Sequence, residues 1–302
     1  MKSVSSSEFR VPSSEFRVSG LGLGFNSKPK THNSELGFTL VEMIVVMVIT
    51  GIIGGMVALF IRAPVQGYVD SARRAEMTDI ADTALRRITR DLRLSLPNSV
   101  RVTQAGAVYY LEFIPTSGGG RYRVGAPGNI LDFTVADTSF DVLGPMPIFA
   151  AGDSVVVYNL GIAGASAYDL PATNNRTTWT SNTATTVTIA AKQFPFESPG
   201  NRFQVISTPV TYVCAPVGGG TGGSLTRYWG YAIQAAQPVN VLAAPLSTAP
   251  HALLATNVGG CSITYDANVV AQRSGLVTMQ LTITESGESV TLYNASHVSN
   301  VP

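Results

Sequence analysis

The stretch that decides the fold covers residues 34–67 and reads "SELGFTLVEMIVVMVITGIIGGMVALFIRAPVQG". Its centre, residues 38–61, is 24 residues long, 18 of them apolar, and it carries one charge, on Glu42. At ~1.5 Å per residue, a helix of that length reaches about 36 Å, which is enough to cross a ~30 Å hydrocarbon layer. The sequence therefore predicts a transmembrane helix over residues 38–61.

A carboxylate inside so apolar a segment needs a physical reason, because at membrane depth it costs on the order of 3 kcal/mol. One simple alternative is a plain anchor, with Glu42 near its edge and reaching water. The other is a cleaved secretory signal, but the apolar run is longer than the usual h-region of about 7–15 residues, and no small-x-small cleavage site follows it. Neither alternative explains the junction Gly37-Phe38-Thr39-Leu40-Val41-Glu42 or the two lysines, Lys28 and Lys30, ahead of it.

This junction closely resembles the type IV pilin and pseudopilin signal. In that family a prepilin peptidase cuts after the glycine, on the cytoplasmic side, and methylates the new N-terminal residue. The resemblance implies cleavage between Gly37 and Phe38 and N-methylation of Phe38. It also implies a role in subunit assembly for Glu42, whose carboxylate would face the N-terminal ammonium of a neighbouring subunit. Since an unpaired carboxylate in an apolar bundle is strongly disfavoured and a paired one is tolerated, Glu42 would fix the register of the subunits.

Cleavage at this junction would separate a leader peptide, residues 1–37, from a mature chain of 265 residues (302 − 37). The leader holds five basic and three acidic residues, so the mature chain has a net charge of −1 (+1 − 2). Such a near-neutral chain has no field that would attract nucleic acid. The leader also contains "SSEFRV" twice, at residues 6–11 and 13–18. Our hypothesis is that residues 1–26 are translated upstream sequence from a start codon assigned too early.

Residues 62–96 continue the helical pattern beyond the span. The apolar stripe of this amphipathic segment, with spacings of three and four, comprises Met77, Ile80, Ala84, Ile88 and Leu92. Pro64 and Gly67 should kink or loosen the helix, and Pro97 is expected to end it.

Charged residues follow the same periodicity on the outside of this segment. The opposite charges expected to pair at i,i+4 are Asp70–Arg74, Asp82–Arg86 and Arg87–Asp91. A basic ridge is formed by Arg86, Arg90 and Arg93. The ridge is interpreted either as a solvated face or as a contact surface for an acidic neighbouring subunit.

Residues 98–302 carry few charges and are rich in Thr, Val, Ser and Gly. Short β-type runs recur there between turn signals. The expected strands are VYYLEFI, NILDFTV, DSVVVYNL, TTVTIAA, RFQVIS, VTYVC, LTRYWGYAI, CSITYD, LVTMQLTIT and ESVTLYNA, with GGGTGG (218–223) as a flexible hairpin loop. One helix followed by a run of strands predicts an α+β fold, in which a long N-terminal helix packs on an antiparallel β-sheet domain. That is also the pilin architecture.

Cys214 and Cys261 are the only cysteines in the sequence. Both follow β-like runs in a domain expected to be exported, which favours one disulfide over a metal site lacking clustered histidines. No G-x-S-x-G elbow frames a nucleophile, and "DFTVADTSFD" (132–141) does not match a calcium loop. An enzyme, a bound metal and a cofactor are therefore not expected.

The family resemblance extends past the junction. Residues 61–102 and 273–302 look like MshO-type minor pilins of mannose-sensitive haemagglutinin (MSHA) pilus systems, whereas residues 121–208 match them only weakly. The resemblance implies a minor pilin that helps to initiate or build an MSHA-type pilus. Before assembly it would cross the inner membrane once, with a cytoplasmic N-terminus and a periplasmic C-terminal domain; afterwards it would lie in the extracellular pilus. The implied partners are prepilin peptidase, other major and minor pilins, the inner-membrane assembly platform and inner-membrane lipid.

Two other functions stay open at this point. One is a minor pseudopilin of a type II secretion system, whose short fibre pushes folded substrates. The other is a pilus-associated adhesin that binds glycan or matrix through the weakly matching region. Tyr228, Trp229 and Tyr231 could line a sugar-binding surface, although aromatic residues in a strand are more often part of a core.

Overall fold

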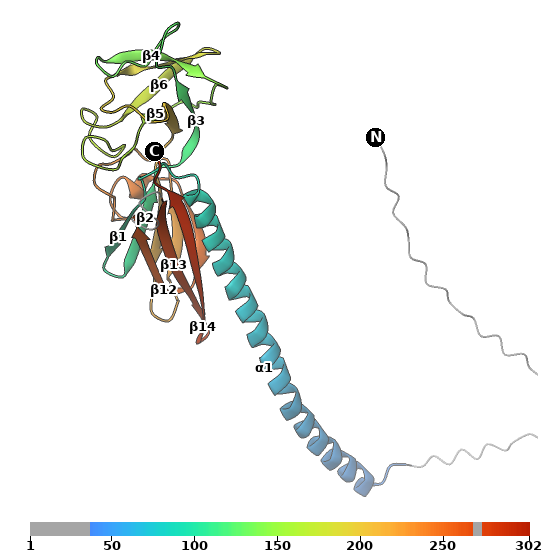
Figure 1. Ribbon diagram of the computed structural model, residues 1–302. Helices are drawn as coiled ribbons and strands as arrows, with labels where there is room; N and C mark the ends of the chain where they lie inside the picture. Colours follow the sequence, from blue (N-terminus) through green and yellow to red (C-terminus); the bar gives the residue numbers. More distant parts are fainter. Residues whose placement is uncertain (1–36, 268–273) are drawn as a thin grey trace, which may run out of the picture. The chain divides into compact units, whose positions relative to one another are not determined.

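The structure, a computed structural model, describes residues 37–267 and 274–302. The tandem repeat, the proposed early start and all of the expected leader before Gly37 lie outside the described residues. By contacts the chain divides into two units, Met1–Ile61 and Arg62–Pro302. The fold class is α+β, as predicted: one long apolar N-terminal helix with antiparallel β-sheets (Figure 1).

The helix α1 spans Leu40–Leu92 and is continuous through Pro64 and Gly67. A proline removes a single backbone donor, and the hydrogen bonds on either side of it keep the helix together. The expected end near Pro97 is too late. The helix stops at Leu92 in a tight turn, where the N–H of Leu94 donates to the carbonyl of Asp91 at 3.1 Å.

The strands form two open sheets and one closed barrel, and all of their pairings are antiparallel. The five-stranded sheet, in the order β1-β2-β9-β10-β11, comprises β1 (Arg101–Ala105), β2 (Val108–Phe113), β9 (Val210–Ala215), β10 (Ser224–Tyr228) and β11 (His251–Thr256). The three-stranded sheet comprises β12 (Val258–Asp266), β13 (Ser274–Glu285) and β14 (Glu288–Ser299). A short 3-10 helix, η1 (Leu246–Thr248), precedes β11.

The barrel is an insertion into the five-stranded sheet. Its strands, in the order β3-β4-β7-β6-β5-β8, are β3 (Thr116–Tyr122), β4 (Asp137–Leu143), β5 (Ser154–Val157), β6 (Arg176–Asn182), β7 (Thr186–Lys192) and β8 (Arg202–Ile206). β2 and β9 pair directly, with Phe113 opposite Val210, so residues 114–209 leave the sheet between these strands and return to it. The labelled barrel strands lie apart from β12–β14 in Figure 1.

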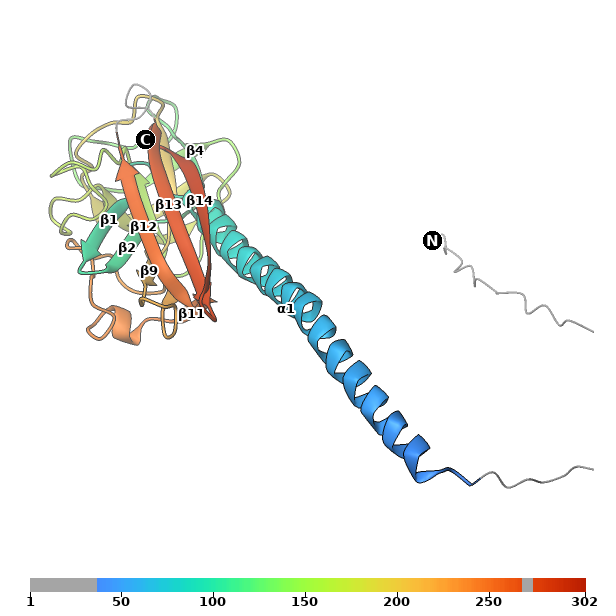
Figure 2. The same cartoon turned by 90° about the horizontal axis from the view of Figure 1, so that it is seen from below.

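The C-terminal part of α1 packs on a core to which both open sheets contribute (Figure 2). Its buried residues are Met77, Ala81, Ala84, Leu85, Ile88 and Leu92, and Ile80 is half-buried against them. The predicted apolar stripe therefore faces the sheets. Burying six apolar side chains supplies the tertiary stabilisation that fixes this half of the helix, since each full burial of a large apolar group is worth about 1.5–3 kcal/mol.

Polar contacts also hold α1 against the sheets. In the last turn of the helix, Asp91 accepts hydrogen bonds from the hydroxyl of Tyr212 (2.7 Å) and from Nε of Arg227 (2.8 Å). An acid at a helix C-terminus is unfavourable to the helix dipole, and the ion pairs with Arg227 and Arg87 compensate for it. Of the predicted i,i+4 pairs, Arg87–Asp91 and Asp82–Arg86 form.

The predicted Asp70–Arg74 ion pair is wrong. Asp70 pairs with Arg73 at 3.3 Å, and Arg74 binds both carboxylate oxygens of Glu288, at 3.1 and 3.2 Å. Glu288 lies at the start of β14, outside the helix. Arg74 therefore obtains this bidentate partner only when the sheet folds against the helix.

Two of the expected strands need correction. NILDFTV (129–135) is a loop, in which the Asp132 carboxylate accepts hydrogen bonds from the N–H (2.7 Å) and Oγ1 (2.6 Å) of Thr134. Such local side-chain bonds compete with strand pairing. LTRYWGYAI is a strand only as far as Tyr228, and Gly230 then turns the chain at a φ of 76°.

The glycine-rich loop at 218–223 joins the paired strands β9 and β10, as expected. Within this loop Gly220 and Gly223 are buried against β12 and β13. A Cβ on Gly220 would collide with the carbonyl of Thr284, and its φ is +85°. Both conditions require glycine at this position.

Candidate functional site

Local hydrogen bonds stabilise the first turn of α1. Thr39 directly precedes the helix, and its Oγ1 accepts a hydrogen bond from the backbone N–H of Glu42 at 3.2 Å. The carbonyl of Thr39 accepts the first intrahelical bond, from Met43. Thr39 is thus the N-cap and Glu42 the third helical residue, the two positions of a capping box. The carboxylate also lies at the positive end of the helix dipole.

The apolar residues that follow are not packed against any other described part of the chain. All of residues 37–61 are exposed, and the most apolar 18-residue window of α1 has a mean hydropathy of 2.8 and no buried residues. By length and composition this helix could cross a membrane. So large an exposed apolar surface is typical of membrane or subunit contact, because soluble monomers rarely expose more than a few hundred Å² in one patch.

Glu42 has no counter-charge in the described part of the chain, where none of the ion pairs involves it. Its hydrogen bond to Thr39 uses the backbone N–H and leaves the carboxylate free to accept others.

The Gly37–Phe38 junction lies immediately ahead of the helix. Neither residue is helical, both are exposed, and Phe38 retains 83 % of its accessible surface. A Cβ added to Gly37 would meet no atom within 4 Å. The peptide bond is thus accessible to a peptidase, and glycine is not required here by the packing of this chain.

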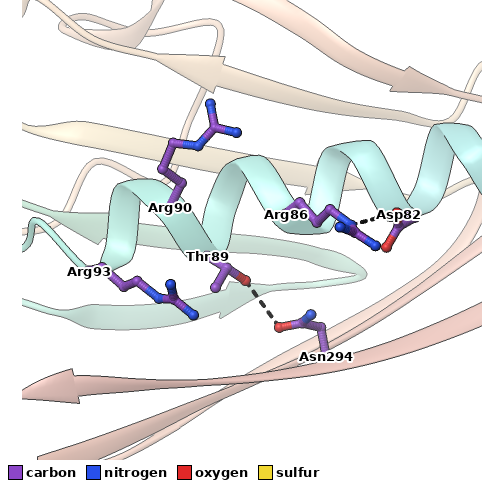
Figure 3. A pocket seen from close by; sticks show the side chains of 6 residues that line it. All are labelled: Asp82, Arg86, Thr89, Arg90, Arg93 and Asn294. Atoms are coloured by element: carbon purple, nitrogen blue, oxygen red, sulfur yellow. Dashed lines mark hydrogen bonds and ion pairs between the residues drawn. The ribbon is translucent and has the colours of Figure 1, made fainter.

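The basic ridge predicted on α1 lines a surface hollow of about 400 Å³ (Figure 3). Its lining consists of Asp82, Arg86, Thr89, Arg90, Arg93 and Asn294. Thr89 Oγ1 donates to Oδ1 of Asn294 on β14 at 3.0 Å, and Arg86 Nε pairs with Asp82 at 2.6 Å. Among the described residues Arg90 and Arg93 take part in no ion pair. The solvated face and the subunit contact both remain compatible with this geometry.

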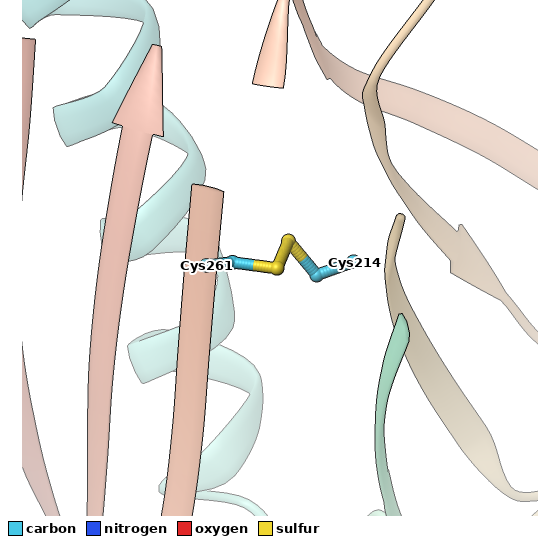
Figure 4. Close-up of a disulfide and its surroundings, with 2 residues drawn as sticks. All are labelled: Cys214 and Cys261. Atoms are coloured by element: carbon cyan, nitrogen blue, oxygen red, sulfur yellow. A yellow bond between two sulfur atoms is a disulfide. The ribbon is translucent and has the colours of Figure 1, made fainter. Parts of the chain in front are cut away.

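Cys214 on β9 and Cys261 on β12 are joined in a disulfide, with their Cα atoms 6.6 Å apart (Figure 4). The bridge connects the five-stranded sheet to the three-stranded sheet beside the buried face of α1, where Leu85 and Ile88 lie close to both cysteines. Closing a loop of this size stabilises a fold by about 4 kcal/mol in the chain-entropy model. The bridge therefore secures the core on which α1 packs.

A buried polar cluster escaped the sequence analysis. Glu112, fully buried on β2, accepts a hydrogen bond from Nη2 of Arg101 on β1 at 2.9 Å. The Arg101 guanidinium also lies 3.7 Å from the ring centre of Tyr168. Burial raises the pKa of Glu112 to about 7, although Arg101 acts in the opposite direction. The one available signal was a glutamate in the middle of the apolar run VYYLEFI.

The other candidate residues have structural partners. Asp132, Asp137 and Asp141 bind neighbouring backbone and hydroxyl groups, and no cluster of three metal-ligating side chains occurs among the described residues. Tyr231 is buried and its hydroxyl bonds to Thr211, which agrees with a core role.

A family model described as "Prokaryotic N-terminal methylation motif" matches residues 32–58. This is the type IV pilin and pseudopilin signal, and the matched range contains the Gly37–Phe38 junction, Glu42 and most of the apolar run. Comparison with curated proteins and comparison with solved structures each return no match. The motif supports a membrane-anchored, pilin- or pseudopilin-like structural subunit, and it implies processing by prepilin peptidase and assembly with other pilins.

Proposed function

We propose that this chain is a minor type IV pilin of the MshO type, processed by prepilin peptidase and used to initiate or build an MSHA-type pilus. The observation that carries the proposal is that several pilin-like features lie together at one place in the chain. The methylation motif falls on a capped helix start, which follows an accessible Gly37–Phe38 bond and leads into the exposed apolar part of α1.

Processing would create the charge that Glu42 lacks. Hydrolysis of the Gly37–Phe38 bond adds one water and leaves a carboxylate on Gly37 and an ammonium on Phe38. Methylation replaces one hydrogen on that nitrogen with a methyl group, and the amine remains basic. Phe38 and Glu42 lie four residues apart, so a neighbouring helix shifted by ~6 Å along the axis would bring its N-terminus level with Glu42.

That pairing would act as a register device. Two charges in an apolar bundle are tolerated only when they meet, because an unpaired one carries the full desolvation penalty. Other axial offsets would leave Glu42 and the neighbouring ammonium unpaired. In this proposal the inner membrane holds the subunit through residues 38–61 until the assembly platform transfers it to the fibre.

The β-rich part is divided into open sheets and an inserted barrel, and this division supports a pilin-type scaffold that carries an additional domain. The strong resemblance to MshO-type proteins lies in residues 61–102 and 273–302, which contribute to α1, β1, β13 and β14. The weakly matching residues, 121–208, coincide with most of the inserted barrel. An adhesive role, the second candidate function, would reside in this barrel.

Intact mass of the protein from cells with and without prepilin peptidase tests the proposal. The expected product lacks residues 1–37 and carries one additional methyl group, and it depends on the peptidase. An unchanged full-length mass in cells that contain the peptidase would reduce residues 38–61 to an ordinary anchor.

A second measurement separates a pilus from a secretion fibre. Pili sheared from the cell surface should contain the chain, and deletion of its gene should reduce the number of pili. If the chain stays in the envelope and its deletion blocks secretion of folded proteins, the type II secretion alternative holds instead.

A further inference from the structure

The outer face of the barrel carries two arginines directly opposite each other. Arg121 on β3 is the cross-strand partner of Arg202 on β8, so both side chains leave the same face of the sheet, and both are exposed. Among the described residues neither forms an ion pair, whereas Arg123, two positions along β3, pairs with Asp141 at 3.4 Å. Like charges in this position destabilise a sheet. Their juxtaposition is therefore unexplained by the fold.

A surface hollow of about 370 Å³ opens at this pair. Its lining comprises Gly119, Gly120, Arg121, Leu143, Pro145, Arg202, Phe203 and Gln204. The floor at Gly119 is bare backbone, because a Cβ on this residue would lie 2.8 Å from the carbonyl oxygen of Phe203.

Gln204 brings a third polar group to the same face. It is the cross-strand partner of Gly119, two positions from Arg202 along β8. Its Oε1 is buried and has no hydrogen-bond partner in the described chain. Because this oxygen is buried, a ligand in the hollow does not reach it, and Gln204 acts only as part of the lining.

We propose that this hollow binds an acidic saccharide. Its carboxylate would lie between the guanidinium groups of Arg121 and Arg202, which match carboxylates with paired hydrogen bonds. The apolar side of the sugar ring would cover Leu143 and Pro145. A simple inorganic anion would satisfy the arginines and leave these two side chains uncovered. The inference deepens the adhesive candidate function, but it rests on the barrel alone and does not require prepilin processing.

Calorimetric titration of the full-length protein in detergent tests the inference, with an oligogalacturonate as the ligand and an uncharged malto-oligosaccharide of the same length as its comparison. At about 0.15 M salt, where exposed charges are largely screened beyond ~8 Å, the acidic saccharide should bind and the neutral one should not. The double variant Arg121→Gln/Arg202→Gln should lose at least about tenfold in affinity.

The matched control is Arg90→Gln/Arg93→Gln, which removes the same charge from the ridge on α1. This control should bind like the wild type. Equal loss in the two double variants would mean general attraction of a polyanion and would overturn the proposal, as would absence of binding to the wild-type protein. Folding of the barrel variant is checked by thermal unfolding. Removing two opposed like charges should leave the melting temperature unchanged or raise it by about 1–2 °C.

Discussion

Arg101 and Glu112 face each other across the hairpin of β1 and β2, as direct cross-strand partners joined by a 2.9 Å hydrogen bond. Arg101 also donates to the carbonyls of Gln234 and Ala235, at 3.0 and 2.8 Å. The pair thereby connects the edge of the five-stranded sheet to the segment that follows β10. Because Glu112 is fully buried, its charge affects the stability of the whole arrangement.

The first prediction concerns pH. Burial raises the pKa of Glu112 from 4.5 to about 7, so the folded state holds this proton more tightly than the unfolded state. The resulting stabilisation is complete below about pH 4.5 and is lost as the pH rises through 7. It amounts to about 3 kcal/mol. Denaturant unfolding of the full-length protein in detergent should therefore show this decrease between about pH 5 and pH 8.

Glu112→Gln should remove that part of the pH dependence, since the amide stays neutral throughout. Glu285→Gln, which deletes an exposed carboxylate at the end of β13, is the control and should keep the wild-type slope. If Glu112→Gln retains the full slope, the titrating group lies elsewhere.

The second prediction concerns the junction before α1. Gly37→Val should block removal of the leader, because the peptidase signal places a glycine before the cut. A side chain at residue 37 meets no atom of the described residues, so folding should be unaffected. Intact mass and thermal unfolding report the two effects separately. Gly67→Ala, at another glycine with open space around it, should be processed normally; normal processing of Gly37→Val would contradict the assigned junction.

The third prediction separates the two roles of Glu42. Glu42→Gln keeps a side chain at the third helical position but removes the charge, so the subunit should be processed normally and yet be missing from sheared pili. Thr39→Ala removes the cap hydrogen bond and should cost the helix about 1 kcal/mol. Because Thr39→Ala leaves the carboxylate in place, it should still enter the fibre. Incorporation of Glu42→Gln at wild-type levels would rule out the pairing with a neighbouring N-terminus.

The fourth prediction concerns the bridge between the sheets. Replacing Cys214 and Cys261 together with Ala should lower the free energy of unfolding by about 2–4 kcal/mol. Reduction of the wild-type protein should have a similar effect, while the double variant should be insensitive to the reductant. Denaturant titration with and without reductant provides the measurement. Equal stability of the oxidised and reduced wild type would contradict a stabilising role.

The sequence by itself determined the features that depend on neighbouring residues. The apolar length of the helix follows from a long hydrophobic run, and the buried face of its second half follows from the three-and-four spacing that ends at Leu92. Strands with clean alternation, such as β13, were found for the same reason. The methylation motif belongs to this class too, because a peptidase reads a contiguous segment.

Only the tertiary structure decided the features that depend on distant pairing. The barrel escaped prediction because β3 is glycine-rich and poor in β-forming residues, and it becomes a strand through its partners on β4 and β8. Arg74 pairs with Glu288 instead of Asp70, and Arg121 lies opposite Arg202. In both pairs the two residues are far apart in the sequence. The environment of Glu112 has the same origin. A pattern of nearby residues fixes which face of an element is apolar, but charge partners and burial are set by which elements fold together.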